Sequence, residues 1–477
     1  MLPTGARCVI LKVDTLKNFH EFGLSERILK ALADTNYAEP TPIQAQAIPL
    51  LLEGHDLLGI AQTGTGKTAA FALPSLNHLS ASFVPLRPRQ PRMLVLAPTR
   101  ELAGQIATSF QQYGRHVRVS VMTAFGGVPI GRQQRALERG VDILVATPGR
   151  LLDLVDSRSL DLAAVEIFVL DEADQMLDLG FIHALRRIVR LLPKKRQSLF
   201  FSATMPPAIA ELAAQFLTNP SKVAVKPAAT TAERVEQRVI HINQSEKQAL
   251  LTLLIRDMDA DIDRALVFTR TKHGADRVVR HLKGAGIDAE AIHGNKSQPQ
   301  RERALGLFRS GDIRVLVATD IAARGIDVPG VSHVFNFELP NVPEQYVHRI
   351  GRTARAGREG LAISLADGGD ERAYLRDIER LIRQQLSVMP LPADFTQRAQ
   401  GLPRPTARPA GERGAGERHD RHDRHDRHHD SRRDRERPRS DDAGRAERPR
   451  HFKPKAKYHA KPAGAAHAAG GGGRRGR

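Results

Sequence analysis

The sequence predicts an α/β protein with two parallel-sheet domains in tandem, followed by a basic tail. Three observations support this expectation. Apolar strand-like runs alternate with amphipathic stretches twice along the chain, the alternation stops near residue 396, and positive charge accumulates after that point. Alternation of this kind favours parallel strands covered by helices on both faces of each sheet.

Ten apolar runs are predicted to be buried strands, each followed by a helical pattern. They span 57–60, 93–97, 119–123, 143–146, 167–170 and 198–201 in the first half, and 264–268, 288–292, 315–318 and 333–337 in the second. We therefore place the two domains at 15–225 and 232–390. The linker at 226–231 contains Pro227 and lacks apolar periodicity.

Composition and length exclude several classes of protein. The 477 residues are 41% hydrophobic and 26% charged, which fits neither a wholly disordered nor a collagen-like chain. The only cysteine, Cys8, cannot form an internal disulfide, so a disulfide-built secreted scaffold is excluded. We find no run of 18 apolar residues and no signal peptide, and therefore expect no membrane span and a cytoplasmic protein, with residues 1–14 as a loose extension.

The C-terminal sixth differs from the rest of the chain. Residues 396–477 contain 23 Lys and Arg against 11 Asp and Glu, a net charge of +12 out of +19 for the whole chain. Arg-His-Asp repeats with a period of three, and four consecutive glycines lie near the end. Apolar area is too scarce there to offset chain entropy, so we predict that 391–477 is a disordered basic tail. The tail is expected to tether RNA; a solubilising or protein-binding role and a metal site in the repeats are the alternatives.

A glycine-rich segment follows the first predicted strand and precedes a helical pattern. It consists of Ala61, Gln62, Thr63, Gly64, Thr65, Gly66, Lys67 and Thr68. In this context the loop N–H groups and the helix N-terminus face phosphates, Lys67 reaches the β- and γ-phosphates, and the Thr68 hydroxyl binds Mg²⁺. The alternative is an ordinary turn between a strand and a helix.

Two carboxylates follow the strand predicted at 167–170. Asp171 and Glu172 would therefore lie at the carboxyl edge of the sheet, beside the phosphate loop. We expect Asp171 to bind Mg²⁺ through water, and Glu172 to orient and deprotonate the attacking water. The alternative is an acidic helix N-terminus that complements the helix dipole.

Taken together, the motifs resemble those of the DEAD-box RNA helicases over about residues 19–390. The first half contains 61–68, Pro98-Thr99-Arg100-Glu101-Leu102, Gly126-Gly127, Thr147-Pro148-Gly149-Arg150, Asp171-Glu172-Ala173-Asp174 and Ser202-Ala203-Thr204. The second contains Phe268-Thr269-Arg270, 298–301, Ala318-Thr319-Asp320, 323–327 and 348–355. The amino-acid sequence at 268–274 and 293–298 is similar to that of the bacterial RhlE-type branch. The resemblance implies two RecA-like domains and an RNA-stimulated ATP hydrolase.

The resemblance assigns further residues to the nucleotide. Phe19 and Gln44 match positions that stack on and hydrogen-bond adenine, which implies ATP. Without the resemblance, the alternative is that Phe19 is a core aromatic and Gln44 a surface amide. Ser202 and Thr204 match the motif that couples hydrolysis to strand separation; otherwise they are a polar strand end. Asn36 and Ala354 replace glycines that are common in the family.

The second domain contributes arginines. Arg349, Arg352 and Arg355 recur every three residues, so a helix would present them along one face. Arg352 and Arg355 match the family's arginine fingers, which stabilise charge on the γ-phosphate, and Asp327 matches a nucleotide contact. Without the resemblance, the arginines are a solvated helix face.

RNA is the expected partner. The positions that match backbone contacts are Thr99, Arg100, Gly126, Gly127, Thr147 and Arg150 in the first domain, and Arg270, Gln298, Arg301 and Thr319 in the second. These hydroxyls, amides, glycine N–H groups and cations suit phosphate and 2′-OH groups, which predicts binding independent of base sequence.

Three functions are compatible with the sequence. The first is an ATP-dependent RNA helicase in which ATP and RNA close the two domains; the second is an ATP-regulated RNA clamp or annealing chaperone; the third is a DNA translocase. The branch resemblance suggests partners in ribosome assembly or RNA turnover. The core is expected to be monomeric.

Overall fold

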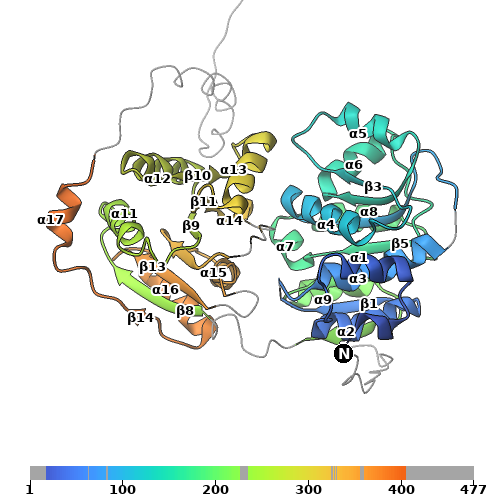
Figure 1. Ribbon diagram of the computed structural model, residues 1–477, viewed down its shortest axis with the longest axis horizontal. Helices are drawn as coiled ribbons and strands as arrows, with labels where there is room; N and C mark the ends of the chain where they lie inside the picture. Colours follow the sequence, from blue (N-terminus) through green and yellow to red (C-terminus); the bar gives the residue numbers. More distant parts are fainter. Residues whose placement is uncertain are drawn as a thin grey trace, which may run out of the picture. The chain divides into compact units, whose positions relative to one another are not determined.

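The computed structural model describes residues 18–62, 64–81, 84–225, 235–323, 326, 328, 330–354 and 359–403. The expected extension at 1–14, the linker at 226–231 and the tail beyond 403 lie outside these residues. Within them are two RecA-like domains, each built on a seven-stranded parallel sheet (Figure 1). None of the described helices is both long and apolar enough to cross a membrane.

The first sheet has the strand order β3-β4-β2-β5-β6-β1-β7, and all its strands are parallel. The strands are β1 (Leu57–Ile60), β2 (Pro91–Leu96), β3 (Val121–Ala124), β4 (Val141–Ala146), β5 (Ile167–Leu170), β6 (Gln197–Ser202) and β7 (Ser221–Ala224). Residues 93–96 of β2 are all apolar because both faces of the strand are covered: Met93 and Val95 pack on one face of the sheet, and Leu94 and Leu96 on the other.

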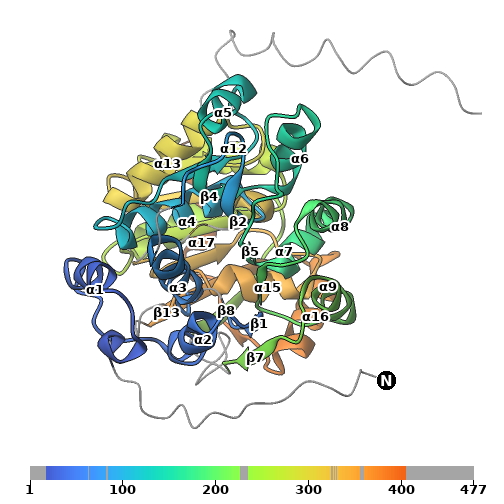
Figure 2. The same cartoon turned by 90° about the vertical axis from the view of Figure 1, so that its right-hand side faces the viewer.

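Helices cover both faces of this sheet (Figure 2). One layer contains η1 (Phe19–Phe22), α1 (Glu26–Ala33), α2 (Pro42–Leu52), α3 (Lys67–Ala81) and α4 (Arg100–Tyr113). The other contains α5 (Ile130–Leu137), α6 (Pro148–Asp156), α7 (Ala173–Asp178), α8 (Ile182–Leu191) and α9 (Pro207–Phe216).

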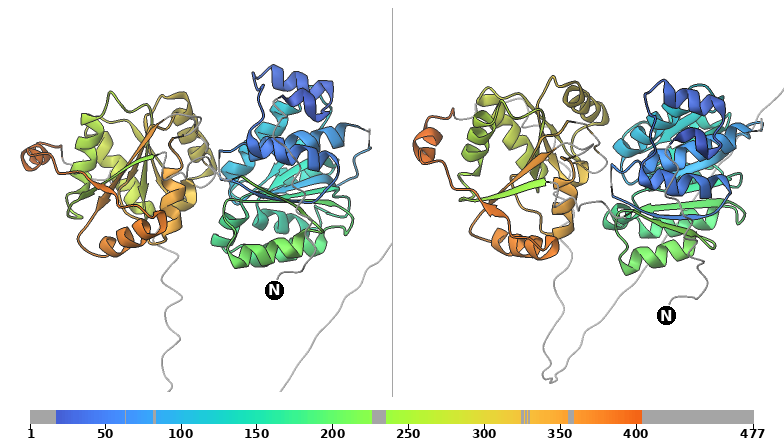
Figure 3. Two further views of the ribbon diagram at one scale, coloured as in Figure 1. Left: turned by 90° about the horizontal axis from the view of Figure 1, so that it is seen from below. Right: turned by 60° about the horizontal axis from the view of Figure 1, so that its bottom comes forward.

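The second sheet repeats this plan with the order β10-β11-β9-β12-β13-β8-β14. Its strands are β8 (Val235–His241), β9 (Ala265–Thr269), β10 (Ala289–Ile292), β11 (Val315–Thr319), β12 (His333–Asn336), β13 (Gly360–Ala366) and β14 (Ser387–Val388). Its two helical layers are seen from further sides in Figure 3. One contains α11 (Lys247–Asp257), α12 (Lys272–Gly284) and α17 (Phe395–Gln400); the other contains α13 (Gln298–Ser310), α14 (Asp320–Ala323), α15 (Pro343–Ile350) and α16 (Glu371–Ile382).

All ten predicted strands are confirmed, with ends that differ by no more than two residues. Four strands escaped the sequence analysis. Strands β7 and β14 are short, largely exposed edge strands, and β8 alternates buried with exposed residues. The pattern in β13 is weakened by Gly360 and Ser364, because neither carries an apolar side chain.

The predicted start of the disordered tail is wrong for residues 391–403. Helix α17 lies in this segment, and Phe395, which is 5% exposed, packs in the core cluster that includes α11. The Arg398 guanidinium also pairs with the carboxylate of Asp257 on α11. The composition of the segment does not reveal this, because Phe395 and one ion pair, with Ala399 and Leu402 packed against the same cluster, are enough to hold it.

Candidate functional site

The phosphate loop joins β1 to α3 as the sequence predicts. Gly64 and Gly66 have φ angles of +83° and +91°, a left-handed conformation that favours glycine. Lys67 is the first residue of α3 and is buried, and its Nζ donates to the carbonyl of Ala61 at 3.0 Å. The ammonium group therefore lies over the start of the loop. Thr65 Oγ1 donates to the carbonyl of Gln62, whereas Thr63 lies outside the described residues.

Gln44 of α2 is fully buried against this loop, so its alternative interpretation as a surface amide is wrong. Its Nε2 donates to the Gly66 carbonyl at 2.9 Å and to the hydroxyl of Tyr37, and its Oε1 accepts from the Thr41 N–H at 2.9 Å. A Cβ at Gly66 would lie 2.3 Å from Nε2. Glycine is therefore required here by both backbone conformation and space.

Phe19 lies in η1 and is 2% exposed. Its ring packs against Phe22 and Tyr37, at centroid distances of 5.9 and 5.2 Å. Phe19 therefore lies in the core, which agrees with the alternative interpretation as a core aromatic. To stack on a base, its ring would have to move. Tyr37, which the sequence analysis did not single out, contacts both Phe19 and Gln44.

The two carboxylates follow β5 directly. Asp171 is 2% exposed, and its Oδ1 accepts from the Glu172 N–H at 3.0 Å. Burial raises the pKa of Asp171 to about 7, although the Lys67 ammonium opposes the shift. Glu172 is buried with a φ of +55°, an unusual conformation for a residue with a side chain, where the chain turns into α7.

Strand order explains why these groups converge. Strands β5, β6 and β1 are neighbours, so their carboxyl ends bring the acidic pair, Ser202 and the phosphate loop to one stretch of the sheet edge. An aspartate carboxylate and the Thr68 hydroxyl are hard oxygen donors of the kind that Mg²⁺ prefers, and a cation would offset the cost of burying Asp171 in its charged form. The donors present therefore fit a magnesium ion.

Asp174 connects the acidic motif to the loop after β6. Its Oδ2 accepts from the Ala203 N–H at 3.1 Å, the Thr204 N–H at 2.9 Å and the Thr204 hydroxyl at 3.0 Å. Ser202 Oγ donates to the Thr204 carbonyl at 2.8 Å. Ser202 and Thr204 were predicted to couple hydrolysis to strand separation, whereas no role was predicted for Asp174, the last residue of the motif 171–174.

The predicted RNA residues of the first domain follow the other strands of the sheet edge. Thr99 caps α4, its Oγ1 accepting from the Leu102 N–H at 3.3 Å, and Thr147 precedes α6. Arg100 lies against Gly127, whose φ is +81° and whose Cβ, if present, would lie 2.0 Å from the guanidinium. Gly126 also adjoins Arg100. These residues follow β2, β3 and β4, which form the half of the sheet away from the phosphate loop.

Arg150 is positioned by contacts that the sequence did not reveal. Its Nη1 donates to the Val128 carbonyl at 3.1 Å and to Gln133 Oε1 at 3.0 Å. Gln133 in turn donates to the Phe125 carbonyl at 3.0 Å. Gln133 thus joins α5 and α6 to the loop that carries Gly126, and no motif pattern marked it.

The predicted RNA residues of the second domain also lie at a carboxyl edge. Thr319 ends β11, and Gln298 and Arg301 lie in the first turns of α13. The N–H of Arg270, just after β9, donates to Glu338 Oε2 at 2.7 Å, and the Arg270 guanidinium lies 5.9 Å from the centre of the Tyr374 ring.

The arginine stripe differs from its prediction. Helix α15 ends at Ile350, so Arg349 and Arg352 do not share a helix face. Arg349 is 1% exposed and not solvated: it binds the Asp320 carboxylate through two nitrogens and donates to the Glu338 carbonyl at 2.7 Å. The three-residue spacing predicted an exposed face, but Arg349 is buried because its partners Asp320 and Glu338 follow the ends of β11 and β12.

Arg352 follows the helix in a turn and is 5% exposed. Its Nη1 donates to the Ile326 carbonyl at 2.9 Å and its Nε to the His348 carbonyl at 3.2 Å. Arg355 and Asp327 lie outside the described residues. The finger role of Arg352 stays a prediction, and it requires the side chain to exchange these contacts.

Comparisons with known proteins agree with this geometry. Residues 41–212 match the family model of the DEAD/DEAH box helicase, and 245–357 match that of the helicase conserved C-terminal domain. The chain is 46% identical over 374 residues to RNA helicase CrhR from Synechocystis sp., covering 78% of this chain and 74% of that protein. It is 44% identical over 379 residues to ATP-dependent RNA helicase CshA from Listeria monocytogenes, covering 79% and 71%.

A solved structure is also similar. S. cerevisiae Dbp5 bound to RNA and ADP BeF3 has a TM-score of 0.71 and 32% identity, covering 81% of this chain and 99% of that one. The finer RhlE-type assignment stays a prediction.

Proposed function

This chain belongs to the DEAD-box family of ATP-dependent RNA helicases, and from that premise we propose which residues bind ATP, which bind RNA and how the two are coupled. The protein is an RNA-stimulated ATP hydrolase and an RNA helicase. One observation carries the residue assignment: neighbouring strands β1, β6 and β5 bring the phosphate loop, the 202–204 loop and the acidic pair to one edge.

ATP is held at that edge. The loop N–H groups and Lys67 cradle the phosphates, and Gln44, packed on Gly66, binds adenine. Asp171 and Thr68 would hold Mg²⁺, which would neutralise developing phosphate charge. Glu172 accepts a proton from the attacking water, and its position next to the phosphate loop supports this role.

RNA is bound through its backbone by both domains. The residues assigned to it in the first domain follow β2, β3 and β4, apart from those assigned to the nucleotide. In the second domain, Arg352 and Arg355 would reach the γ-phosphate on closure, so that hydrolysis requires the two domains to meet. A groove that admits only a bent strand then excludes the complementary strand.

Several finer features belong to the same proposal. The tail tethers RNA through its cations, the core acts as a monomer in the cytoplasm, and the substrates are precursor ribosomal or decaying RNAs. Support for the tether is the net charge of +12 after residue 395.

The experiment compares the wild-type protein with Glu172→Gln. ATPase is measured with RNA, with DNA and without nucleic acid, and displacement of a short RNA duplex is measured in parallel. We expect RNA alone to stimulate the wild type, and Glu172→Gln to bind ATP and RNA while losing at least about 100-fold in turnover. Glu138→Gln, at an exposed position directly after α5, is the control. Normal turnover in Glu172→Gln refutes the assignment, and ATP-dependent binding without strand displacement favours an RNA clamp.

A further inference from the structure

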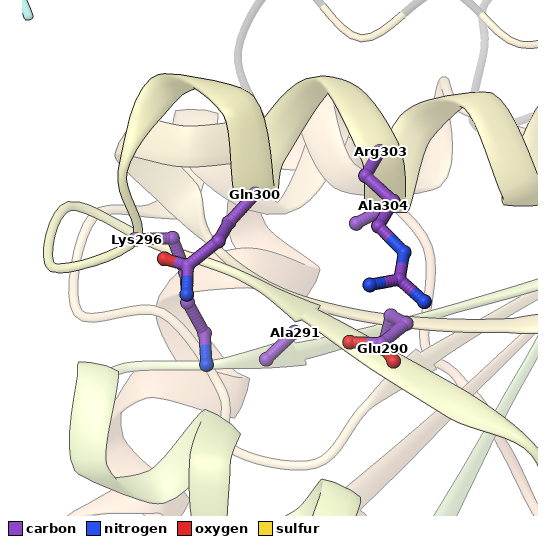
Figure 4. A pocket seen from close by; sticks show the side chains of 6 residues that line it. All are labelled: Glu290, Ala291, Lys296, Gln300, Arg303 and Ala304. Atoms are coloured by element: carbon purple, nitrogen blue, oxygen red, sulfur yellow. The ribbon is translucent and has the colours of Figure 1, made fainter.

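The free edge of the second sheet carries a groove that the proposed function does not use. Strand β10 lies at one of the two edges of the sheet, with α12 packed on one of its faces and α13 on the other. The groove, with a volume of about 140 Å³, is lined by Glu290, Ala291, Lys296, Gln300, Arg303 and Ala304. Figure 4 shows Lys296, Gln300 and Arg303 projecting from the α13 side toward the strand.

Two carboxylates at this edge, Glu290 and Asp276, are paired with cations. Glu290 Oε1 lies 2.8 Å from Nζ of Lys283 on α12. Asp276 Oδ1 lies 2.9 Å from Lys296 Nζ and 3.0 Å from the His293 ring, and these groups hold the pKa of Asp276 well below its usual range although burial opposes the shift. The first ion pair joins α12 to the edge strand, and the second joins α12 to the segment before α13.

Further cations lie on α12 and α13, the two helices that flank this edge. Within the part of the chain that the structure describes, the guanidinium groups of Arg277, Arg280 and Arg303 make no ion pair. Arg277 and Arg280 are exposed on α12, and both lower the pKa of His281, in addition to its burial. Lys272, at the start of α12, donates to the neutral amide oxygen of Asn295 at 3.1 Å. Asp288, before β10, and Glu302, on α13, are exposed carboxylates. They are fewer than the exposed cations of the two helices, so the surface keeps an excess of positive charge.

The cations on α12 and α13 lie near the predicted RNA residues. Helix α12 begins two residues after Arg270, and α13 begins with Gln298, so both helix starts lie at the carboxyl edge of the sheet. From there α12 extends for about 20 Å. We call Lys272, Arg277, Arg280, Lys296 and Arg303 the edge surface.

We propose that the edge surface binds the phosphate backbone of RNA that extends beyond the segment held by the core. Guanidinium groups suit this ligand because their planar donors match phosphate oxygens, and the groove is large enough for a phosphate group. Recognition is independent of base sequence, because no aromatic side chain lines the groove. The inference rests on the proposed helicase function and specifies how far its RNA track extends.

The test uses the full chain with Arg277→Glu and Arg303→Glu combined. Arg309→Glu with Arg376→Glu is the matched control, since both arginines are exposed in the same domain and the charge change is equal. Dissociation constants are measured by fluorescence anisotropy for an 8-nucleotide and a 25-nucleotide RNA at several salt concentrations. ATPase stimulation is measured with the short RNA.

We expect the test variant to bind the long RNA about 10-fold more weakly, with a salt dependence reduced by about one to two phosphate contacts. Affinity for the short RNA and its ATPase stimulation stay within twofold of wild type, as does the control with both RNAs. The Arg277→Lys and Arg303→Lys combination restores most of the affinity. Equal losses for both RNAs, an unchanged long-RNA affinity, or an equal loss in the control overturns the proposal.

A further arm separates RNA from small anions. Inorganic phosphate at 10 mM, at constant ionic strength, should not remove the difference between the two RNAs. If it does, the groove is a small-anion site and the proposal is overturned. The proposed function fails separately, if the wild type shows no stimulation by the short RNA.

Discussion

The hydrogen bonds of Asp174 predict how hydrolysis is coupled to strand separation. Asp174 is 8% exposed, and its Oδ2 accepts three hydrogen bonds from Ala203 and Thr204. The perturbation is Asp174→Asn, which keeps the shape of the side chain but removes its charge. Hydrogen bonds to a charged group contribute about 1.5–3 kcal/mol and neutral ones about 0.5–1.5. With about 1 kcal/mol lost per bond, the 203–204 loop loses up to about 3 kcal/mol of local stability.

Such a loss increases local opening of the loop by about 150-fold. The phosphate loop, Asp171 and Glu172 keep their own contacts, so we expect ATP binding to change by less than threefold. Strand displacement should fall much further, because it needs the loop held in one position. The assay measures ATP hydrolysed per short duplex displaced, together with urea unfolding.

Asp156→Asn is the control, because this carboxylate is about half exposed and pairs with Arg187 on the surface. It should change the ratio of ATP to duplex by less than twofold. An unchanged ratio in Asp174→Asn, with a stability loss below about 0.5 kcal/mol, refutes the coupling argument.

Two further predictions concern stability. Because burial raises the pKa of Asp171 to about 7, the folded protein holds a proton that the unfolded chain releases between about pH 4 and pH 7. The destabilising effect of this group therefore grows over that range and is constant above pH 7. Asp171→Asn should therefore raise the melting temperature more at pH 8 than at pH 5 in the absence of nucleotide, and equal gains at both pH values would contradict the shifted pKa. Phe395→Ala should lower the free energy of unfolding of the second domain by about 2–4 kcal/mol in urea, because a buried ring is removed from the cluster with α11. Thr396→Ala, at an exposed neighbouring position, should change it by less than about 0.5 kcal/mol, and equal effects would show that α17 is not anchored through Phe395.

The sequence by itself determined the fold class and most of the chemistry. Strand periodicity located ten strands, because buried parallel strands must be apolar on both faces, and that signal is local. The phosphate loop and the acidic pair were equally visible, because the residues of each motif lie within a few positions of one another along the chain. Alternation of strands and helices also implied that such motifs meet at the carboxyl edge.

Only the tertiary structure decided which partners each side chain has. Asp174 contacts Thr204 from 30 residues away, Gln133 orients Arg150, and Arg349 is buried on Asp320 instead of facing solvent. None of these follows from spacing along the chain, because each depends on which strands are neighbours in the sheet. The packing of α17 and the charge of the edge surface were also decided by the tertiary structure. Each depends on which helices and strands lie next to one another in the fold.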